Sequence, residues 1–203
     1  MAIQNFIQGT VRGKIGGHIG GSWKNKKTQR AYPDKVHDAH SDAQVTVRDN
    51  FRAVTDIAKA INDVWSKKYF GKLKSMSGYN NFVKNQKGKM NASDFSPTEI
   101  QFPQSYLGAP VAPSSTPTVS DSTVTVAMPA PTALALGTPT EYLVAVYDPQ
   151  NKIAVAKAVT AAAVSVELIL PVTPNAGDKL YVYTQAGDGT RVNFSNATEL
   201  TVS

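Results

Sequence analysis

The sequence contains no cysteine. Disulfides, thiolate metal ligands and a cysteine nucleophile are therefore excluded, which fits assembly in a reducing cytoplasm. Long apolar runs are also missing, because none approaches the roughly 18 residues that a membrane-spanning helix needs. The first residues lack the charged and then apolar plan of a signal peptide. We therefore expect a protein that is made in the cytoplasm and has no membrane partner.

The sequence also lacks the combinations of residues that are typical of catalytic sites. The sequence has three histidines, and no Ser-His-Asp order, catalytic carboxylate pair or cofactor motif. The glycine-rich run 13–21 does not close with the Gly-Lys-Ser/Thr of a phosphate-binding loop. The segment 37–42, His-Asp-Ala-His-Ser-Asp, has the donor types of a metal site, but Ser and Asp are equally typical of a helix start. We expect no catalytic residues, no cofactor and no metal.

Charge is unevenly distributed along the 203 residues. Residues 1–95 contain 17 Lys and Arg against 7 Asp and Glu, a net charge of +10, whereas residues 96–203 contain 4 against 8, a net charge of −4. Five prolines occur within 96–117, which excludes a long helix there. The composition predicts a basic N-terminal domain (1–95), a proline-rich connector (96–117) with an edge strand over 98–107, and a C-terminal domain (118–203).

The most unusual stretch is the glycine-rich, basic segment 9–33. It contains six glycines and six cations, and no acidic residue precedes Asp34. Glycines contribute little to a packed core, but they let another backbone or a phosphate chain approach closely. We predict an extended β-hairpin whose turn is Asn25-Lys26-Lys27, bracketed by Trp23 and Tyr32.

Two helices are predicted after the hairpin. Ser41 and Gln44 have the spacing of a capping box, and apolar residues then recur at helical spacing: Val47, Phe51, Val54, Ala58, Ile61 and Trp65. This pattern predicts a helix over 41–67, with Asp63 and Lys67 as an i,i+4 ion pair. A shorter helix is predicted over 77–87, with an apolar face made by Tyr79, Phe82 and Val83. The two helices could pack together and carry the hairpin.

The rest of the chain is a succession of short β signals. Apolar residues alternate with small or polar ones, and clusters of Pro, Asn, Gly and Asp separate the runs. The predicted strands are 122–128, 141–147, 152–157, 163–170, 179–184 and 199–202. Such alternation suits sheets that are buried on one face, and this number of strands in about 90 residues favours an immunoglobulin-like sandwich. The predicted fold class is α+β: a glycine-rich β-hairpin and two helices, then an all-β sandwich.

The basic hairpin is the candidate interaction site. Interface centres favour aromatic residues and arginine, and the residues predicted to bind a partner are Arg12, Lys14, Trp23, Lys24, Lys26, Lys27, Arg30 and Tyr32. The same cations with interleaved aromatic rings could instead bind nucleic acid without sequence preference, or be solvated surface. A further alternative is that Trp23 packs on the helix 41–67 of its own chain.

Four motifs stand out along the chain: the segment 13–24, the helical residues Gln44, Arg48 and Phe51, the stretch 78–84, and the strand 178–183 with 194–196. Together they resemble an uncharacterised family of about 200 residues found in gut-type Gram-negative bacteria and their phages. The resemblance implies a phage or prophage structural gene. We therefore expect a non-enzymatic virion component of the capsid, portal-neck region or tail, made in the host cytoplasm, present in many copies and docked on other virion proteins. The alternative is a nucleic-acid-binding protein that uses the basic N-terminal half.

Overall fold

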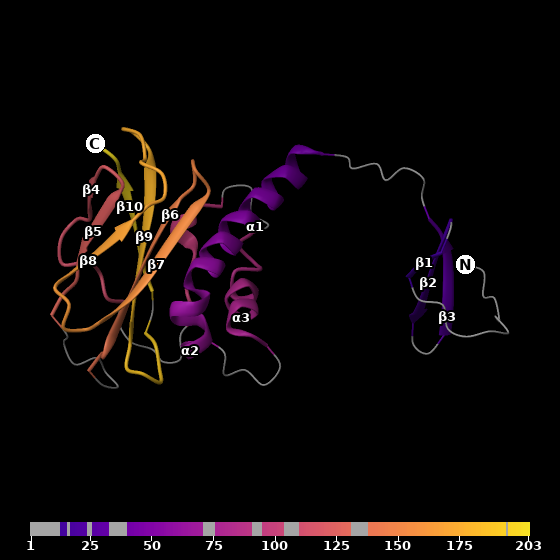
Figure 1. Cartoon of the computed structure of the whole chain (residues 1–203), viewed down its shortest axis with the longest axis horizontal. Helices are drawn as coiled ribbons and strands as arrows, with labels where there is room; N and C mark the ends of the chain where they lie inside the picture. Colours follow the sequence, from indigo (N-terminus) through magenta and orange to yellow (C-terminus); the bar gives the residue numbers. More distant parts are fainter. Residues whose placement is uncertain are drawn as a thin grey trace. The chain divides into compact units, whose positions relative to one another are not determined.

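The computed structural model describes residues 13–15, 17–23, 26–32, 40–70, 76–90, 95–103, 110–130, 138–193 and 195–203. The chain divides into two compact units, Met1–Ser41 and Asp42–Ser203. Figure 1 labels the helices and strands of both units. This division differs from the predicted one, because the expected connector 96–117 and the predicted helices lie in the same unit as the C-terminal strands.

The first unit contains a three-stranded antiparallel sheet in the order β1-β2-β3. The strands are β1 (Gly13–Ile15), β2 (His18–Trp23) and β3 (Lys26–Ala31). β2 and β3 form the predicted hairpin, and β1 is an additional strand paired with β2. The predicted turn is corrected in part: Lys26 already belongs to β3, where it pairs with Trp23, and Asn25 lies outside the described residues. A strand accommodates Lys26 and Lys27 because backbone groups alone form the ladder.

The second unit begins with the predicted long helix. It consists of α1 (Asp42–Ile61), a π-helical turn η1 (Asn62–Ser66) and α2 (Lys67–Tyr69). The predicted ion pair is present, with Lys67 Nζ at 2.6 Å from Asp63 Oδ1. None of the described helices is long and apolar enough to cross a membrane.

The second predicted helix is α3 (Gly78–Asn85), which contacts α1, η1 and α2. Its N-cap is Ser77, whose hydroxyl accepts a hydrogen bond from the backbone N–H of Asn80 at 3.2 Å. Glycine is required at the first helical position, because a Cβ on Gly78 would lie 2.1 Å from the carbonyl oxygen of Ser66. This close approach brings the apolar face of α3, including the fully buried Phe82, against the end of the long helix.

Seven strands follow in the described residues, and each of the six strands predicted between 122 and 202 is present within a few residues. One sheet has the order β4-β5-β8 and the other the order β10-β9-β6-β7. The strands are β4 (Thr118–Ser120), β5 (Thr123–Ala127), β6 (Glu141–Asp148), β7 (Ile153–Thr160), β8 (Ser165–Ile169), β9 (Lys179–Gly187) and β10 (Asn196–Thr201).

The two sheets pack face to face over a common apolar core, to which Val124, Val144, Leu168 and Val182 contribute. The chain crosses between the sheets after β5, after β7 and after β8, so that strands distant in sequence become neighbours. Three strands facing four in this order make an immunoglobulin-like sandwich, as predicted.

The helices cover the outer face of the larger sheet, as Figure 1 shows for α1 and β6–β7. Side chains alternate between the two faces of a strand. In β6, Tyr142, Val144 and Val146 face the other sheet, whereas Leu143 and Tyr147 belong to the core under the helices. The expectation of sheets buried on one face is therefore wrong for β6 and β9, because the helices add a third layer.

The proline-rich segment is part of this core. Ile100 and Phe102 are 1% and 2% exposed, and the Phe102 ring stacks on Tyr183 with 5.5 Å between centroids. A short 3-10 helix, η2 (Pro97–Glu99), replaces the first residues of the predicted edge strand. No strand occurs over 98–103, and residues 104–109 lie outside the described ranges. Apolar side chains between the prolines thus attach the segment to the sandwich, where a connector between two domains was expected.

Candidate functional site

The strand register groups the residues that were predicted to bind a partner. Lys14 pairs with Ile19, and Ile19 with Arg30, so these three form one row across the sheet. Trp23 pairs with Lys26 four positions further along β2. Because residues at even separations along a strand share a face, both rows occupy the same face of the sheet. We name the positions Lys14, Ile19, Trp23, Lys26 and Arg30 the basic-aromatic face.

The remaining predicted residues are placed as follows. Tyr32 follows β3 directly, and its backbone N–H donates to the carbonyl oxygen of Gly17 at 2.7 Å, which extends the ladder by one residue. Lys27 pairs with Ser22 and belongs to the opposite face. Arg12 and Lys24 lie outside the described residues. The register therefore joins four of the eight predicted residues on one face and separates Lys27 from them.

Residues 17–21 and 28–32 of the sheet form no buried interior of their own. Among residues 17–21 and 28–32, none is buried: Ile19 is half-buried, Arg30 is exposed, and Tyr32 is 38% exposed. A small sheet is stable by itself when an apolar face packs against something. Within these residues no such layer exists, so packing against another surface would add a missing core.

Two glycines, Gly17 just before β2 and Gly21 within it, have room for a side chain among the described residues. A Cβ on Gly17 would meet nothing within 4 Å, and one on Gly21 would meet the Thr28 hydroxyl at an ordinary 3.5 Å. Neither glycine has a positive φ. Crowding and backbone strain therefore do not explain these two glycines.

Charge on the sheet is of one sign. The described strand residues 13–15, 17–23 and 26–32 include Lys14, Lys26, Lys27 and Arg30 but no Asp or Glu. A surface of this kind attracts carboxylates or phosphates through its cations. Within the described part of the chain, no group of three or more His, Asp or Glu side chains could hold a metal ion.

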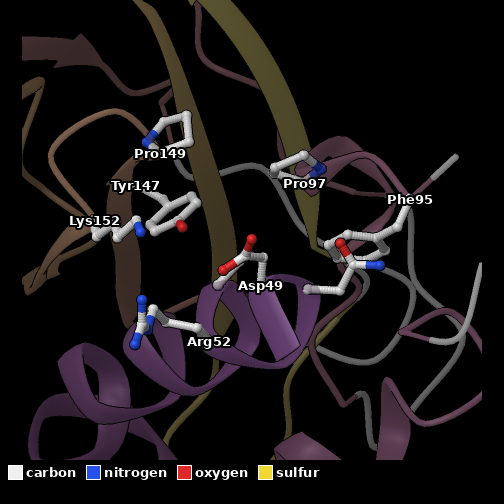
Figure 2. A pocket seen from close by; sticks show the side chains of 9 residues that line it. Asp49, Arg52, Phe95, Pro97, Tyr147, Pro149 and Lys152 are labelled. Carbon is white, nitrogen blue, oxygen red and sulfur yellow. The ribbon is translucent and has the colours of Figure 1, made fainter. Parts of the chain in front are cut away.

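A second site, which the sequence did not predict, is a pocket of about 250 Å³ in the second unit. Figure 2 shows its lining side chains, which come from α1, from the start of η2 and the residues before it, and from the end of β6 with the turn after it. The lining includes Asp49, Arg52, Phe95, Tyr147, Pro149 and Lys152. No local sequence signal could have found this pocket, because its three contributing segments are distant in sequence.

Tyr147 is the central residue of this pocket. The residue is 3% exposed, and its hydroxyl still reaches solvent, since among the described residues Ser66 Oγ is the one buried side-chain polar atom without a hydrogen-bond partner. Burial raises the pKa of Tyr147 to about 12, with a further increase from the carboxylates of Asp56, Asp148 and Asp49 and a decrease from Arg52. The hydroxyl therefore keeps its proton at neutral pH and is available as a donor.

No family model matches the chain, and no curated protein sequence is similar to it. Solved structures similar to it are fibronectin type III domains. They include the FN1–FN3 domains of chicken CNTN1 (10% identity, TM-score 0.35, covering 47% of this chain and 31% of that one). The fn3 domain of the human collagen alpha-1(XX) chain has 20% identity and a TM-score of 0.32, covering 48% of this chain and 88% of that one. The fn3 domain of human contactin 1 has 16% identity and a TM-score of 0.30, covering 49% and 86%.

Proposed function

We propose that this protein is a non-enzymatic structural component of a phage particle, which it joins through its N-terminal sheet. The partner is another virion protein of the capsid, portal-neck region or tail, and the immunoglobulin-like unit is displayed or packs on neighbouring subunits. The resemblance of the sequence to a phage-associated family supplies the phage context. The proposed attachment rests on the properties of the sheet.

The observation that carries the proposal is that the sheet has one basic-aromatic face and no buried residue among residues 17–21 and 28–32. Docking on a partner would supply the missing apolar layer around Trp23 and Ile19. The cations Lys14, Lys26 and Arg30 would meet carboxylates at the edge of the contact. Open glycine positions allow the two backbones to come close.

The second unit fits the role of a rigid body. Several of its fully buried polar side chains form structural hydrogen bonds: Gln86 donates to the carbonyl oxygen of Gln101, and Thr184 donates to that of Val111 at 2.6 Å. The Asn193 side-chain oxygen accepts from the backbone N–H of Ala186 at 2.9 Å. These groups hold the layers together, which supports a structural rather than a catalytic role for them.

The test is incorporation into particles. Phages carrying a deletion of 9–33, or the double change Trp23→Ala and Arg30→Glu, are purified, and the amount of this chain per particle is measured by quantitative mass spectrometry. Lys157→Glu, which changes an exposed charge on β7, is the matched control. We expect the wild-type protein and the Lys157→Glu control to be present in stoichiometric amounts in the particles. Both N-terminal variants should be lost from the particles. Normal incorporation of variants whose second unit is folded by circular dichroism would refute attachment through the sheet.

A nucleic-acid-binding protein is the second candidate, favoured by the lack of carboxylates among the described strand residues of the sheet. Such binding would depend on phosphate neutralisation and fall steeply with salt. Fluorescence anisotropy with a labelled DNA duplex at rising salt concentrations separates the two functions. Weak, salt-sensitive binding without sequence preference agrees with the structural role, whereas tight, salt-resistant, sequence-selective binding would favour the nucleic-acid function.

A further inference from the structure

β8 is an edge strand of the smaller sheet, since among the described residues it pairs with β5 alone. The bond from the Met128 N–H to the Val164 carbonyl oxygen, at 2.9 Å, continues this ladder just before β8 begins. In an antiparallel pair such bonds recur at every second residue, so the even-numbered residues of β8 bond to β5. The backbone groups of Ser165, Glu167 and Ile169 therefore point away from β5, where they form no backbone hydrogen bond among the described residues.

The exposed apolar side chains of the sandwich lie along the same edge. Among the residues described between 110 and 203, three large apolar side chains are exposed: Val164 (79%), Ile169 (70%) and Val172 (44%). Ile169 belongs to β8, and the other two lie just before and just after it. An open strand edge together with exposed apolar side chains is typical of a surface that pairs with another strand.

The two sheets are unequal, and the place beside β8 holds no described strand. The larger sheet has four strands and ends at β7, whereas the smaller has three and ends at β8. β7 and β8 lie side by side at this margin of the sandwich (Figure 1). Val155, Lys157 and Val159 of β7 face the smaller sheet, because their partners in β6 do so. Both valines are only half-buried, so a strand added beside β8 would cover them.

Two exposed charges indicate what such a strand would carry. Lys157 lies between Val155 and Val159, and its Nζ lies 3.5 Å from the carbonyl oxygen of Glu167, at the open edge. Its ammonium group forms no ion pair with a described residue. An apolar strand would bury this charge unpaired, which is unfavourable, whereas an inward-facing carboxylate would pair with it. Glu167 is exposed on the outer face of β8, where it favours a basic residue directly opposite.

We propose that β8 accepts an extended segment of another protein as a fourth, antiparallel strand, with a carboxylate facing Lys157 and a basic side chain opposite Glu167. The outward backbone groups of β8 supply the hydrogen bonds, and β-branched residues at the other inward positions cover Val155 and Val159. The β8 strand of a second copy is a poorer occupant, because two-fold pairing would bring the two Lys157 ammonium groups together. The contact is separate from the N-terminal sheet and does not depend on its attachment role.

Two peptides of identical composition test the proposed charges. Isotope-labelled full-length protein is titrated with acetyl-Val-Thr-Glu-Lys-Val-Thr-Val amide and followed by NMR. Because side chains alternate along a strand, this peptide places its carboxylate inward and its ammonium group outward. The comparison peptide, acetyl-Val-Thr-Lys-Glu-Val-Thr-Val amide, exchanges the two charges. We expect saturable binding of the first peptide and about tenfold weaker binding of the second. Equal binding of the two would overturn the proposal.

Hydrogen exchange shows whether the contact is strand pairing. In the free protein the amides of Ser165, Glu167 and Ile169 should exchange quickly, and those of Val166 and Leu168 slowly. The first peptide should slow the exchange of the first three amides. Binding without this gain in protection would contradict the proposal. A free protein that sediments as a dimer, with these three amides already protected, would assign the edge to a second copy instead.

Variants make the test sharper. Lys157→Glu should weaken the first peptide about tenfold, and adding Glu167→Lys should reverse the preference, so that the comparison peptide binds more tightly. Lys87→Glu, which changes an exposed lysine beyond the end of α3, is the matched control and should leave the affinity unchanged. Unchanged affinity in Lys157→Glu, or no reversal in the double variant, would contradict the assigned charges. Because Lys157→Glu leaves the N-terminal sheet unaltered, its peptide binding should fall while its incorporation into particles stays normal.

Discussion

The indole N–H of Trp65 donates a hydrogen bond to the side-chain oxygen of Gln185 at 2.8 Å, across 120 residues of sequence. The amide nitrogen of Gln185 donates in turn to the carbonyl oxygens of Pro103, at 3.1 Å, and Asn193, at 2.8 Å. Trp65 and Gln185 are fully buried. One side chain therefore joins η1, the proline-rich segment and the chain after β9, which explains why these parts form one unit.

Gln185→Leu should destabilise the second unit by roughly 3 kcal/mol, because it leaves the Trp65 N–H and two carbonyl groups buried without partners. The free energy of unfolding is measured by urea denaturation followed by circular dichroism. Gln150→Leu, exposed in the turn after β6, is the control and should change stability by about 0.5 kcal/mol or less. Helical and β signals should be lost in a single transition. Separate transitions would instead support the division at 96–117.

The apolar stripe of α1 is buried over only part of its length. Ile61 is fully buried, whereas Phe51, on the same stripe, is 49% exposed. Ile61→Ala should therefore cost about 2–5 kcal/mol of stability, and Phe51→Ala about 1 kcal/mol or less. Urea denaturation of the two variants measures the difference. Equal losses would mean that the N-terminal half of α1 is covered in solution.

Periodicity predicted the helices and strands because it reports which residues share a face. It does not report how far a partner layer extends along that face. The repeat from Val47 to Trp65 continues without a break, yet the sheet covers it only from Ala53 onward. The length of the covered part depends on β6 and β7, which lie about 90 residues further along the chain.

The third layer could also have been inferred from the sequence, but only with a different rule. The six residues 142–147 are all apolar or aromatic, and a continuous apolar run indicates a strand buried on both faces. Alternation along the neighbouring runs suggested one buried face instead. The sequence did not indicate that the helices form the covering layer. Leu143 and Tyr183 share a core with Val54 and Trp65 only in the folded chain.

The composition of the candidate site was predictable, and its arrangement was not. Glycines and cations indicated an interaction hairpin, but a shift of one residue in strand pairing moves every side chain to the other face. The pairing of Trp23 with Lys26 is what places Lys26 with Arg30 and Lys27 opposite. Predicting that pairing requires knowing the residue at which β3 begins. The predicted turn at 25–27 placed that start too late in the sequence, because Lys26 already belongs to β3.

Buried tyrosines should make the second unit sensitive to alkali. Burial raises the pKa of Tyr147 to about 12, and burial also raises the pKa of Tyr183 well above its usual value. A group whose pKa is raised in the folded state stabilises the fold below the unfolded pKa of about 10, and this contribution is lost as pH rises from there to the folded pKa. We expect stability to be constant up to about pH 9 and to fall between pH 10 and 12.

The contribution of Tyr147 is measurable by removing its hydroxyl. Tyr147→Phe should leave stability at pH 7 within about 0.5 kcal/mol of wild type and reduce the alkaline loss by on the order of 2 kcal/mol. Urea denaturation at several pH values measures both quantities. Tyr32→Phe, which lies in the other unit, is the control. An unchanged alkaline loss in Tyr147→Phe would show that this hydroxyl ionises as readily in the folded protein as in the unfolded one.

Gly21→Val tests which face of the N-terminal sheet binds the partner. Gly21 lies between Ile19 and Trp23 on the basic-aromatic face, and a Cβ there has room beside Thr28 at 3.5 Å. Valine favours strands and glycine does not, so the variant sheet should form at least as well as the native one. Its side chain would nevertheless keep a partner backbone away from this face. We expect less of this chain per purified particle, measured by quantitative mass spectrometry.

Gln29→Val is the matched control, because it places the same side chain on the opposite face, where Gln29 pairs with Gly20. It adds the same β-branched bulk to the sheet and should leave incorporation unchanged. Loss with Gln29→Val and normal incorporation with Gly21→Val would assign attachment to the opposite face, which carries Lys27. Normal incorporation of both variants would mean that neither face requires close backbone contact, and the open glycine positions would then have no role in attachment.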